Sequence, residues 1–312
     1  MPETEDHSIV LITGNSLRHK RFALRLQQEF GDLVSAWFEI ERKPKSEKLV
    51  GKINVKTMLY VFMKKTGSYK YYFFIKNCAY LMKRKKSINA FKIIKSVQEI
   101  MRNEHELQMY RKEFKQAETR LFAKEVAKLK KAVKKEPIKI SNPNSQEFLK
   151  QIRNLSPYFF LTLSGPLYKG TLLDAVRGVC INQHAGHSPD IKGTRTIEWA
   201  LYRRSLEFIS STVHLTSTGA DSGPILRRSQ PCLLPSDDPG ACFARVVALG
   251  TEMMIEVVRD IIECKEVIVF EQPLGRGKTY LGKDMKDFII RRIHNDHQNG
   301  WLRKEKERMR EF

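Results

Sequence analysis

The sequence predicts an α/β fold with an open, mainly parallel sheet of the Rossmann-like type. Short apolar runs alternate with helical patterns over most of the 312 residues, and many of these runs end in glycine or polar residues. Both observations favour parallel strands joined by helices. In addition, 41% of the residues are hydrophobic, yet no run approaches the roughly 18 apolar residues that a membrane-spanning helix needs.

The chain opens with a β-α-β pattern. An apolar run at 8–13 ends at Gly14, a helical pattern follows over 17–30, and a second strand is predicted at 34–38. Ligands bind where such strands end, so Ser16 and Arg18, just after the first strand, are candidate substrate-binding residues for a phosphate group. No GxGxxG or GKS/GKT motif accompanies them, and a plain structural turn is an equal alternative.

Residues 40–136 are predicted to be a basic, helical insertion. A long charged helix is expected from 97 to 135, where Pro137 stops it, whereas the aromatic cluster between 60 and 74 fits no assigned element. Residues 1–150 hold 33 of the 56 lysines and arginines and 16 of the 35 acidic residues, a balance of +17 against +4 for the remainder. This asymmetry indicates either a solvated lysine-rich surface or a polyanionic partner such as nucleic acid.

After Pro137 the alternation of strands and helices resumes. Strands are predicted at 138–140, 158–163, 178–181, 208–215 and 225–234, and helices at 145–155, from 171, around 199–201 and at 239–263. The segment 182–192 has no regular period. The predicted organisation is therefore a catalytic domain over 1–265, with the insertion inside it, and a small C-terminal module over 266–312.

The cysteine pattern and the N-terminus indicate the compartment. The five cysteines are odd in number and never spaced as CxxC, which argues against disulfides and against a zinc site. The first seven residues are acidic and polar, unlike a secretory leader. We expect a cytoplasmic protein with no bound metal and no membrane contact; the sequence leaves the oligomeric state open.

The most informative residues follow the strand predicted at 178–181. Asn182 and His184 form an Asn-x-His pair, and alternate residues of an extended chain point the same way. An amide donor beside an imidazole can stabilise an oxyanion and exchange a proton near neutral pH. Asp221, in a later loop, is a candidate for the missing carboxylate, whereas His214, inside a predicted strand, is expected to be structural.

These motifs carry a family resemblance. The order Asn-x-His, a proline-containing loop, a Trp-Ala-Leu helix, then Thr-Val-His with an aspartate seven residues beyond it resembles the formyltransferases that use 10-formyltetrahydrofolate. The likeness extends over about 158–263. It implies a formyltransferase-like fold and an N-formyltransferase activity, with Asn182, His184 and Asp221 as catalytic residues. It also implies that 10-formyltetrahydrofolate, the cosubstrate, lies against Gly165, Leu167, Tyr168, Thr216 and Asp221.

The acceptor is predicted from a departure from the family. The usual Ser-Leu-Leu-Pro after the histidine is here Ala-Gly-His-Ser-Pro at 185–189, a smaller and more polar loop in which His187 is a further candidate for substrate binding. This loop favours a small-molecule amine, first of all a nucleotide-linked amino sugar. Formylation of methionyl-tRNA and carbamoyl transfer stay open as alternatives. So does a non-enzymatic, basic nucleic-acid-binding protein.

Overall fold

The computed structural model describes residues 7–41, 90–133 and 135–308. The described residues of 1–42 and 112–312 form one compact unit, and those of 43–111 form a second. Helix α4 (Ala90–Ala132) contributes residues to both units. It covers most of the long helix predicted from the sequence and begins seven residues earlier. The aromatic cluster at 60–74 lies outside the described residues.

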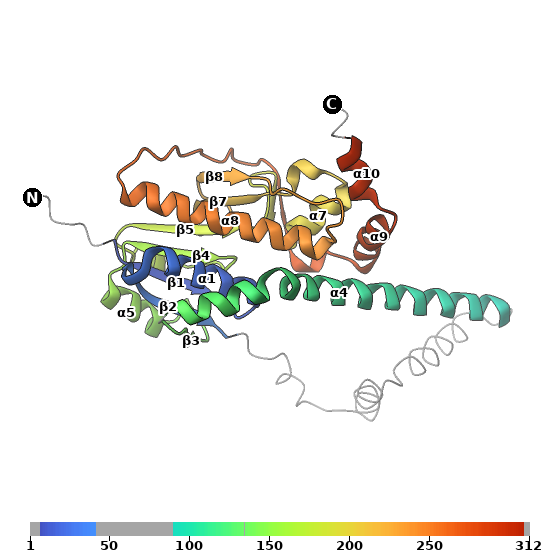
Figure 1. Cartoon of the computed structure of the whole chain (residues 1–312), viewed down its shortest axis with the longest axis horizontal. Helices are drawn as coiled ribbons and strands as arrows, with labels where there is room; N and C mark the ends of the chain where they lie inside the picture. Colours follow the sequence, from blue (N-terminus) through green and yellow to red (C-terminus); the bar gives the residue numbers. More distant parts are fainter. Residues whose placement is uncertain (1–6, 42–89, 134, 309–312) are drawn as a thin grey trace, which may run out of the picture. The chain divides into compact units, whose positions relative to one another are not determined.

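The first unit is built on one twisted sheet (Figure 1). Its described strands lie in the order β3 (Ile138–Ile140), β2 (Val34–Ile40), β1 (Ile9–Thr13), β4 (Phe159–Leu163), β5 (Val179–His184), β7 (Ser211–Leu215) and β8 (Ile225–Ser229). Neighbours from β3 to β5 are parallel, β7 is antiparallel to β5, and β8 is antiparallel to β7. The predicted mainly parallel α/β fold is confirmed.

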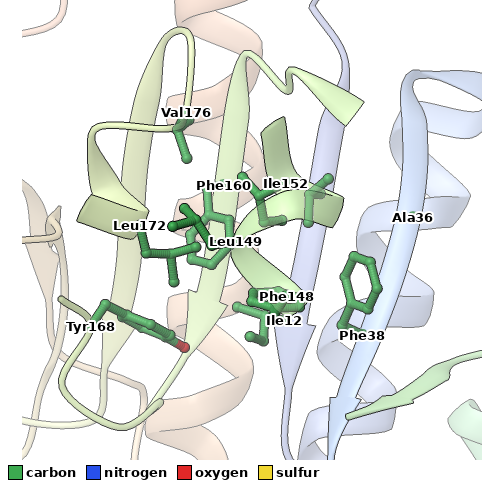
Figure 2. Packing of buried hydrophobic residues seen from close by; sticks show 11 residues of the cluster. Ile12, Ala36, Phe38, Phe148, Leu149, Ile152, Phe160, Tyr168, Leu172 and Val176 are labelled. Atoms are coloured by element: carbon green, nitrogen blue, oxygen red, sulfur yellow. The ribbon is translucent and has the colours of Figure 1, made fainter. Parts of the chain in front are cut away.

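Helices cover both faces of this sheet. On one face, α5 (Gln146–Leu155) buries an apolar stripe against β1, β2 and β4, and Figure 2 shows Phe148 of this helix beside Ile12 and Phe38. Ile9 and Leu11, which alternate with the residues of that face, are also fully buried. A strand buried on both faces is typical of parallel sheets. α1 (Leu17–Phe30) and α8 (Pro239–Ile262) pack together, and α8 also lies along β5 and β7.

Several strand boundaries differ from those predicted. β5 continues through His184, so the segment predicted to lack regular structure from Asn182 on begins with strand. It also includes the short strand β6 (Ile191–Gly193). β7 starts at Ser211, after a 3-10 turn, and β8 ends at Ser229. The end of β5 is polar, and only its pairing with β4 and β7 shows that it is extended.

The C-terminal segment belongs to the same compact unit as the sheet, whereas a separate module was predicted from residue 266. β9 (Lys278–Tyr280) pairs with β6, and Phe270 pairs with Ile225 at the start of β8. Helix α9 (Asp287–Gln298) packs on α7 (Thr196–Arg203) and is followed by α10 (Trp301–Arg308). The stretch before α9 is polar and contains glycines, so its sequence pattern did not predict the pairing of β9 with β6.

Among the residues that the structure describes, no helix is long and apolar enough to cross a membrane. No group of three or more His, Cys, Asp or Glu among them could hold a metal ion. Four cysteines are described, at positions 180, 232, 242 and 264, and each is a free thiol.

Candidate functional site

Three polar side chains meet on one face of the sheet, at the end of β5. Asn182 and His184 are alternate residues of this strand and therefore point to the same face. Since β7 pairs antiparallel with β5, His214 lies directly opposite Asn182. The three residues are 8%, 4% and 2% exposed, respectively. Strand pairing thus gathers an amide and two imidazoles where little water reaches them.

Asp221 adds the carboxylate from the loop between β7 and β8. Its Oδ2 lies 3.3 Å from His184 Nδ1, and its Oδ1 lies 3.5 Å from Asn182 Nδ2 and 3.6 Å from His214 Nε2. The backbone N–H of Gly193 donates to Oδ2 over 2.7 Å. The structure thus brings together all three residues predicted to be catalytic, and we refer to Asn182, His184, His214 and Asp221 as the polar cluster.

Hydrogen bonds orient the amide of Asn182. The Thr162 hydroxyl donates to Asn182 Oδ1 over 2.7 Å, which turns the NH2 group away from β4. His214 Nδ1 faces the carbonyl oxygen of Leu215 at 2.8 Å and must donate to it. In the neutral ring, Nε2 is then an acceptor for Asn182 Nδ2 at 3.0 Å. One amide hydrogen is thereby used, and the other faces Asp221 across the longer 3.5 Å contact.

His184 is surrounded by acceptors. Nε2 lies 3.3 Å from the carbonyl oxygen of Ile191, and Nδ1 lies 3.3 Å from Asp221. Burial lowers the pKa of His184 below its ordinary value; the charge of Asp221 opposes this, and His214 adds to it. The resting ring is therefore neutral at neutral pH and has one proton between two acceptors. If the His184 ring took up a second proton, each ring nitrogen would donate to one of these acceptors. This arrangement suits a group that accepts a proton transiently.

Asp221 is held as a carboxylate. Burial by itself would raise its pKa. In the acid range where this carboxyl titrates, the charge that His184 then carries and the hydrogen bond and charge of His214 outweigh burial, and the pKa falls to about 2. The N–H of Gly193 acts in the same direction. A base beside a fixed carboxylate in a buried place is an arrangement suited to moving protons.

The residues predicted to lie beside the folate are only partly available to a ligand. Leu167 is 59% exposed, and its carbonyl oxygen accepts a hydrogen bond from Asn144, which holds the turn after β4. Tyr168 points instead into the apolar core (Figure 2), and a Cβ at Gly165 would lie 2.1 Å from its hydroxyl. Thr216 is tied to the sheet through its backbone N–H. Of Tyr168, therefore, only the backbone suits the predicted role, while the exposed Gly165 and Leu167 are accessible to a ligand.

The turn before α1 differs from the predicted phosphate site. Ser16 occupies the N-cap position, but its hydroxyl contacts His19 Nδ1 at 2.7 Å rather than a backbone amide. The guanidinium of Arg18 pairs with Glu118 of α4 and lies over the ring of Phe243. A carboxylate therefore already occupies the place expected for a phosphate, and an anionic ligand would have to displace it.

The loop 185–189 packs inward. All of its residues are buried except the half-buried His187, whose Nδ1 contacts the Ser210 hydroxyl at 3.0 Å. The Thr212 hydroxyl accepts from the backbone N–H of Ser188 over 3.2 Å and donates to another backbone group of the loop. The loop was predicted to present small polar groups to an amine. In the structure its backbone is bonded to Thr212 of β7, and the Ser188 hydroxyl is buried without a hydrogen-bond partner among the described residues.

Three contributors to the site were missed in the sequence. His214 lies within a strand as predicted, yet it contacts both Asn182 and Asp221. Thr162 orients the amide, and Gly193 binds the carboxylate through its backbone. The Thr-Val-His motif pointed to His214, but only the antiparallel register between β5 and β7 places this histidine beside Asn182.

Comparisons with known proteins show which family this chain resembles. The formyl transferase family model matches residues 93–258, more than half of the chain, and this range contains the three predicted catalytic residues. The methionyl-tRNA formyltransferase of Thermodesulfovibrio yellowstonii is 26% identical over 153 residues, 49% of this chain and 47% of that protein. The corresponding protein of Aromatoleum aromaticum is 32% identical over 119 residues, 38% of this chain and 37% of that protein.

The chain thus spans about half the length, or less, of the curated relatives it matches. Among solved structures, a sugar N-formyltransferase from Shewanella aligns with a TM-score of 0.48 at 11% identity, over 92% of this chain and 88% of that one. On the strength of the family match, which contains Asn182, His184 and Asp221, the chain belongs to the formyl transferase family.

Proposed function

We propose that this protein transfers a formyl group from 10-formyltetrahydrofolate to a primary amine. The observation that carries the proposal is the polar cluster, in which an amide, a neutral imidazole and a carboxylate meet within hydrogen-bonding reach. Membership of the formyl transferase family supports the same chemistry. The folate is a substrate here, consumed in each turnover.

The residues fit the reaction step by step. The neutral amine attacks the formyl carbon, and the carbonyl oxygen becomes an oxyanion. The second amide hydrogen of Asn182, which has only a long contact to Asp221, is the free donor for that charge. As the new C–N bond forms, the amine loses a proton.

His184 is the acceptor for the amine proton. It rests neutral, and its imidazolium would be stabilised by Asp221 and by the Ile191 carbonyl. The bond between the formyl carbon and the folate nitrogen then breaks, and the proton passes on to that nitrogen. Both ring nitrogens of His184 face protein acceptors in this structure, so a substrate atom would replace one of two 3.3 Å contacts.

For the acceptor we propose a nucleotide-linked amino sugar. The part of the chain after residue 150, which contains the polar cluster, has a net charge of only +4, and a small amine does not require an extended basic surface. The Glu118 carboxylate at the α1 turn argues that the phosphates of such a ligand bind elsewhere than Arg18. Neither the inward-packed loop 185–189 nor this turn selects the sugar.

Formylation of methionyl-tRNA is the second candidate. It is favoured by the curated relatives described above, which are methionyl-tRNA formyltransferases. A tRNA acceptor would make use of exposed lysines, and its binding would weaken steeply with salt because bound counterions are released.

The test is release of tetrahydrofolate, followed by absorbance, when the full chain is given 10-formyltetrahydrofolate and a panel of amines at fixed ionic strength. Amino-sugar nucleotides and charged tRNA are the two main arms. Turnover with an amino-sugar nucleotide is expected. Turnover with tRNA alone would overturn the acceptor but keep the chemistry, and no turnover with any amine would overturn both.

A further inference from the structure

The C-terminal segment reaches the candidate site from outside the range matched by the family model. After α8 the chain returns along β8, where the backbone of Phe270 exchanges two hydrogen bonds with Ile225, of 2.8 and 2.9 Å. Two residues later, Gln272 meets the loop that carries Asp221. The side chain of Gln272 is a candidate for a role that neither the polar cluster nor the family match explains.

The amide of Gln272 joins both sides of the turn after Asp221. Nε2 donates to the carbonyl oxygen of Asp221 over 2.9 Å and to that of Gly223 over 2.6 Å. A carbonyl oxygen only accepts, so the NH2 group must face these two atoms. The other amide atom, Oε1, is buried without a hydrogen-bond partner among the described residues. The side chain therefore contributes donors to this loop and nothing else.

The backbone conformation of the loop at Asp221 is one that side-chain hydrogen bonds such as those of Gln272 would stabilise. Asp221 has φ of 49°, in the left-handed region that few residues other than glycine adopt. Its carboxylate contacts two imidazoles, an amide and one backbone N–H, so a small change in the loop would alter every distance from Asp221 to the other residues of the polar cluster.

The same C-terminal segment also holds the other side of the Asp221 carboxylate. Lys278 and Tyr280 in β9 pair with β6, whose Gly193 donates its N–H to Asp221. Gly193 has φ of 91°, and a Cβ there would lie 2.2 Å from the carbonyl oxygen of Tyr280. One stretch of chain thus supports both the aspartate and its backbone donor.

We propose that Gln272 is a positioning residue for the proposed formyl transfer, acting by holding the Asp221 loop so that its carboxylate stays beside His184. The inference rests on the proposed function only in that Asp221 takes part in the reaction. The structural part, that Gln272 sets the distance between Asp221 and His184, stands independently and can be measured without turnover.

The test replaces Gln272 by methionine in the full chain, which keeps the length of the side chain and removes its donors. The matched control is Gln230→Met, because Gln230 Nε2 also donates to a backbone carbonyl, that of Glu207 at 2.7 Å, but at an exposed position. The primary readout is the pKa of His184 from NMR of histidine-ring-labelled protein, assigned by its loss in His184→Gln. Asp221 and His214 are the titratable groups that face this ring.

Asp221→Asn provides the reference, since it removes the charge that raises the pKa of His184. Gln272→Met is expected to shift the His184 midpoint down, in the same direction and by less, while Gln230→Met leaves it at the parent value. Exchange of the Gly193 amide should also accelerate, and kcat should fall about tenfold with the KM for the folate within about twofold, as for a displaced catalytic group.

A His184 midpoint in Gln272→Met that is unchanged or raised would overturn the proposal, whatever the rate. If Gln272→Met does not fold, Gln272→Leu is tested with the same readouts, because it cannot donate and adds no charge near His184. If the parent protein transfers no formyl group to any amine, the proposed function fails. The midpoint and the Gly193 exchange then still decide whether Gln272 positions Asp221.

Discussion

Two strands of the same sheet, β1 and β5, end in polar residues, and their surroundings differ in one respect. At the end of β1, the charges are already paired: Arg18 binds Glu118, and Ser16 binds His19. At the end of β5, acceptors outnumber the protons available: His184 faces two acceptors, and Asn182 has a hydrogen with only a long contact. In the first arrangement Arg18 and Ser16 already have protein partners, whereas the second has donors and acceptors available for a substrate and a proton.

The largest effect is expected at the polar cluster. Asn182→Ala, His184→Ala and Asp221→Asn should each reduce kcat by roughly 10² or more, because each removes a donor or proton carrier that acts at the reacting atoms. Folate release with the cognate amine measures the rates, and circular dichroism checks the fold. Near-parent rates in all three variants would contradict the proposal that the end of β5, unlike the end of β1, takes part in the reaction.

A smaller loss is expected when the orientation of Asn182 is disturbed. Thr162→Val keeps the shape of a fully buried side chain but removes the hydroxyl that donates to Asn182 Oδ1. The amide can then rotate, and kcat should fall about tenfold, the size of one hydrogen bond's contribution. Thr162→Ser restores the donor and should recover most of the rate. Equal losses in the two variants would point to packing rather than orientation.

The low pKa of His184 predicts how the stability of the polar cluster depends on pH. Its folded pKa is lowered, so the unfolded chain takes up the proton first as pH falls below 6.5, and the free energy of unfolding should decrease there. Asp221, with a folded pKa of about 2, contributes stability above its unfolded value of 3.8 and loses it as pH falls from 3.8 through about 2. The window for His184 therefore opens near pH 6.5, and that for Asp221 opens near pH 3.8.

Urea unfolding at pH 7 and pH 5 measures the first of these windows. The decrease between the two pH values should be smaller in His184→Gln than in the parent protein. His187, whose pKa burial also lowers, contributes in the same direction, and His187→Gln is the control for that share. An identical pH slope in the parent and in His184→Gln would show that His184 is not buried in neutral form.

At the end of β1 only a small effect is expected. Glu118→Gln removes the carboxylate beside Arg18, and because that pair is structural the KM for the acceptor should stay within about twofold. A marked fall in KM for a phosphate-bearing acceptor would instead show that a phosphate competes with Glu118 for this turn. Steady-state kinetics against one amino-sugar nucleotide distinguishes the two results.

The smallest effect is expected on the basic face of α4. Lys128, Lys130 and Lys131 are exposed, and replacing all three with glutamine should leave kcat and KM within about twofold, as for most surface changes. A large rise in KM that high salt reproduces in the parent protein would contradict this and favour a tRNA acceptor. Lys134, in the same basic run, lies outside the described residues and is left unchanged.

The sequence by itself determined the order of the main strands and helices, but not the short strands β6 and β9. A five-residue apolar run such as Ile9–Thr13, which ends at a glycine, indicates a buried strand, and the helix from Leu17 to Phe30 ends where Gly31 allows a positive φ. Local spacing also brought out Asn182 and His184, because alternation along an extended chain needs no knowledge of the neighbouring strands. These features depend on residues close together in the chain.

Only the tertiary structure decided which distant groups meet. The antiparallel register of β5 and β7 places His214 beside Asn182, and the pairing of β6 with β9 brings Gly193 to Asp221. Glu118, a hundred residues from Arg18, occupies the turn that local sequence had suggested for a phosphate. A hydrogen bond depends on distance in space and not along the chain. The partners that the side chains at the ends of β1 and β5 find, or lack, can therefore be seen only in the folded structure.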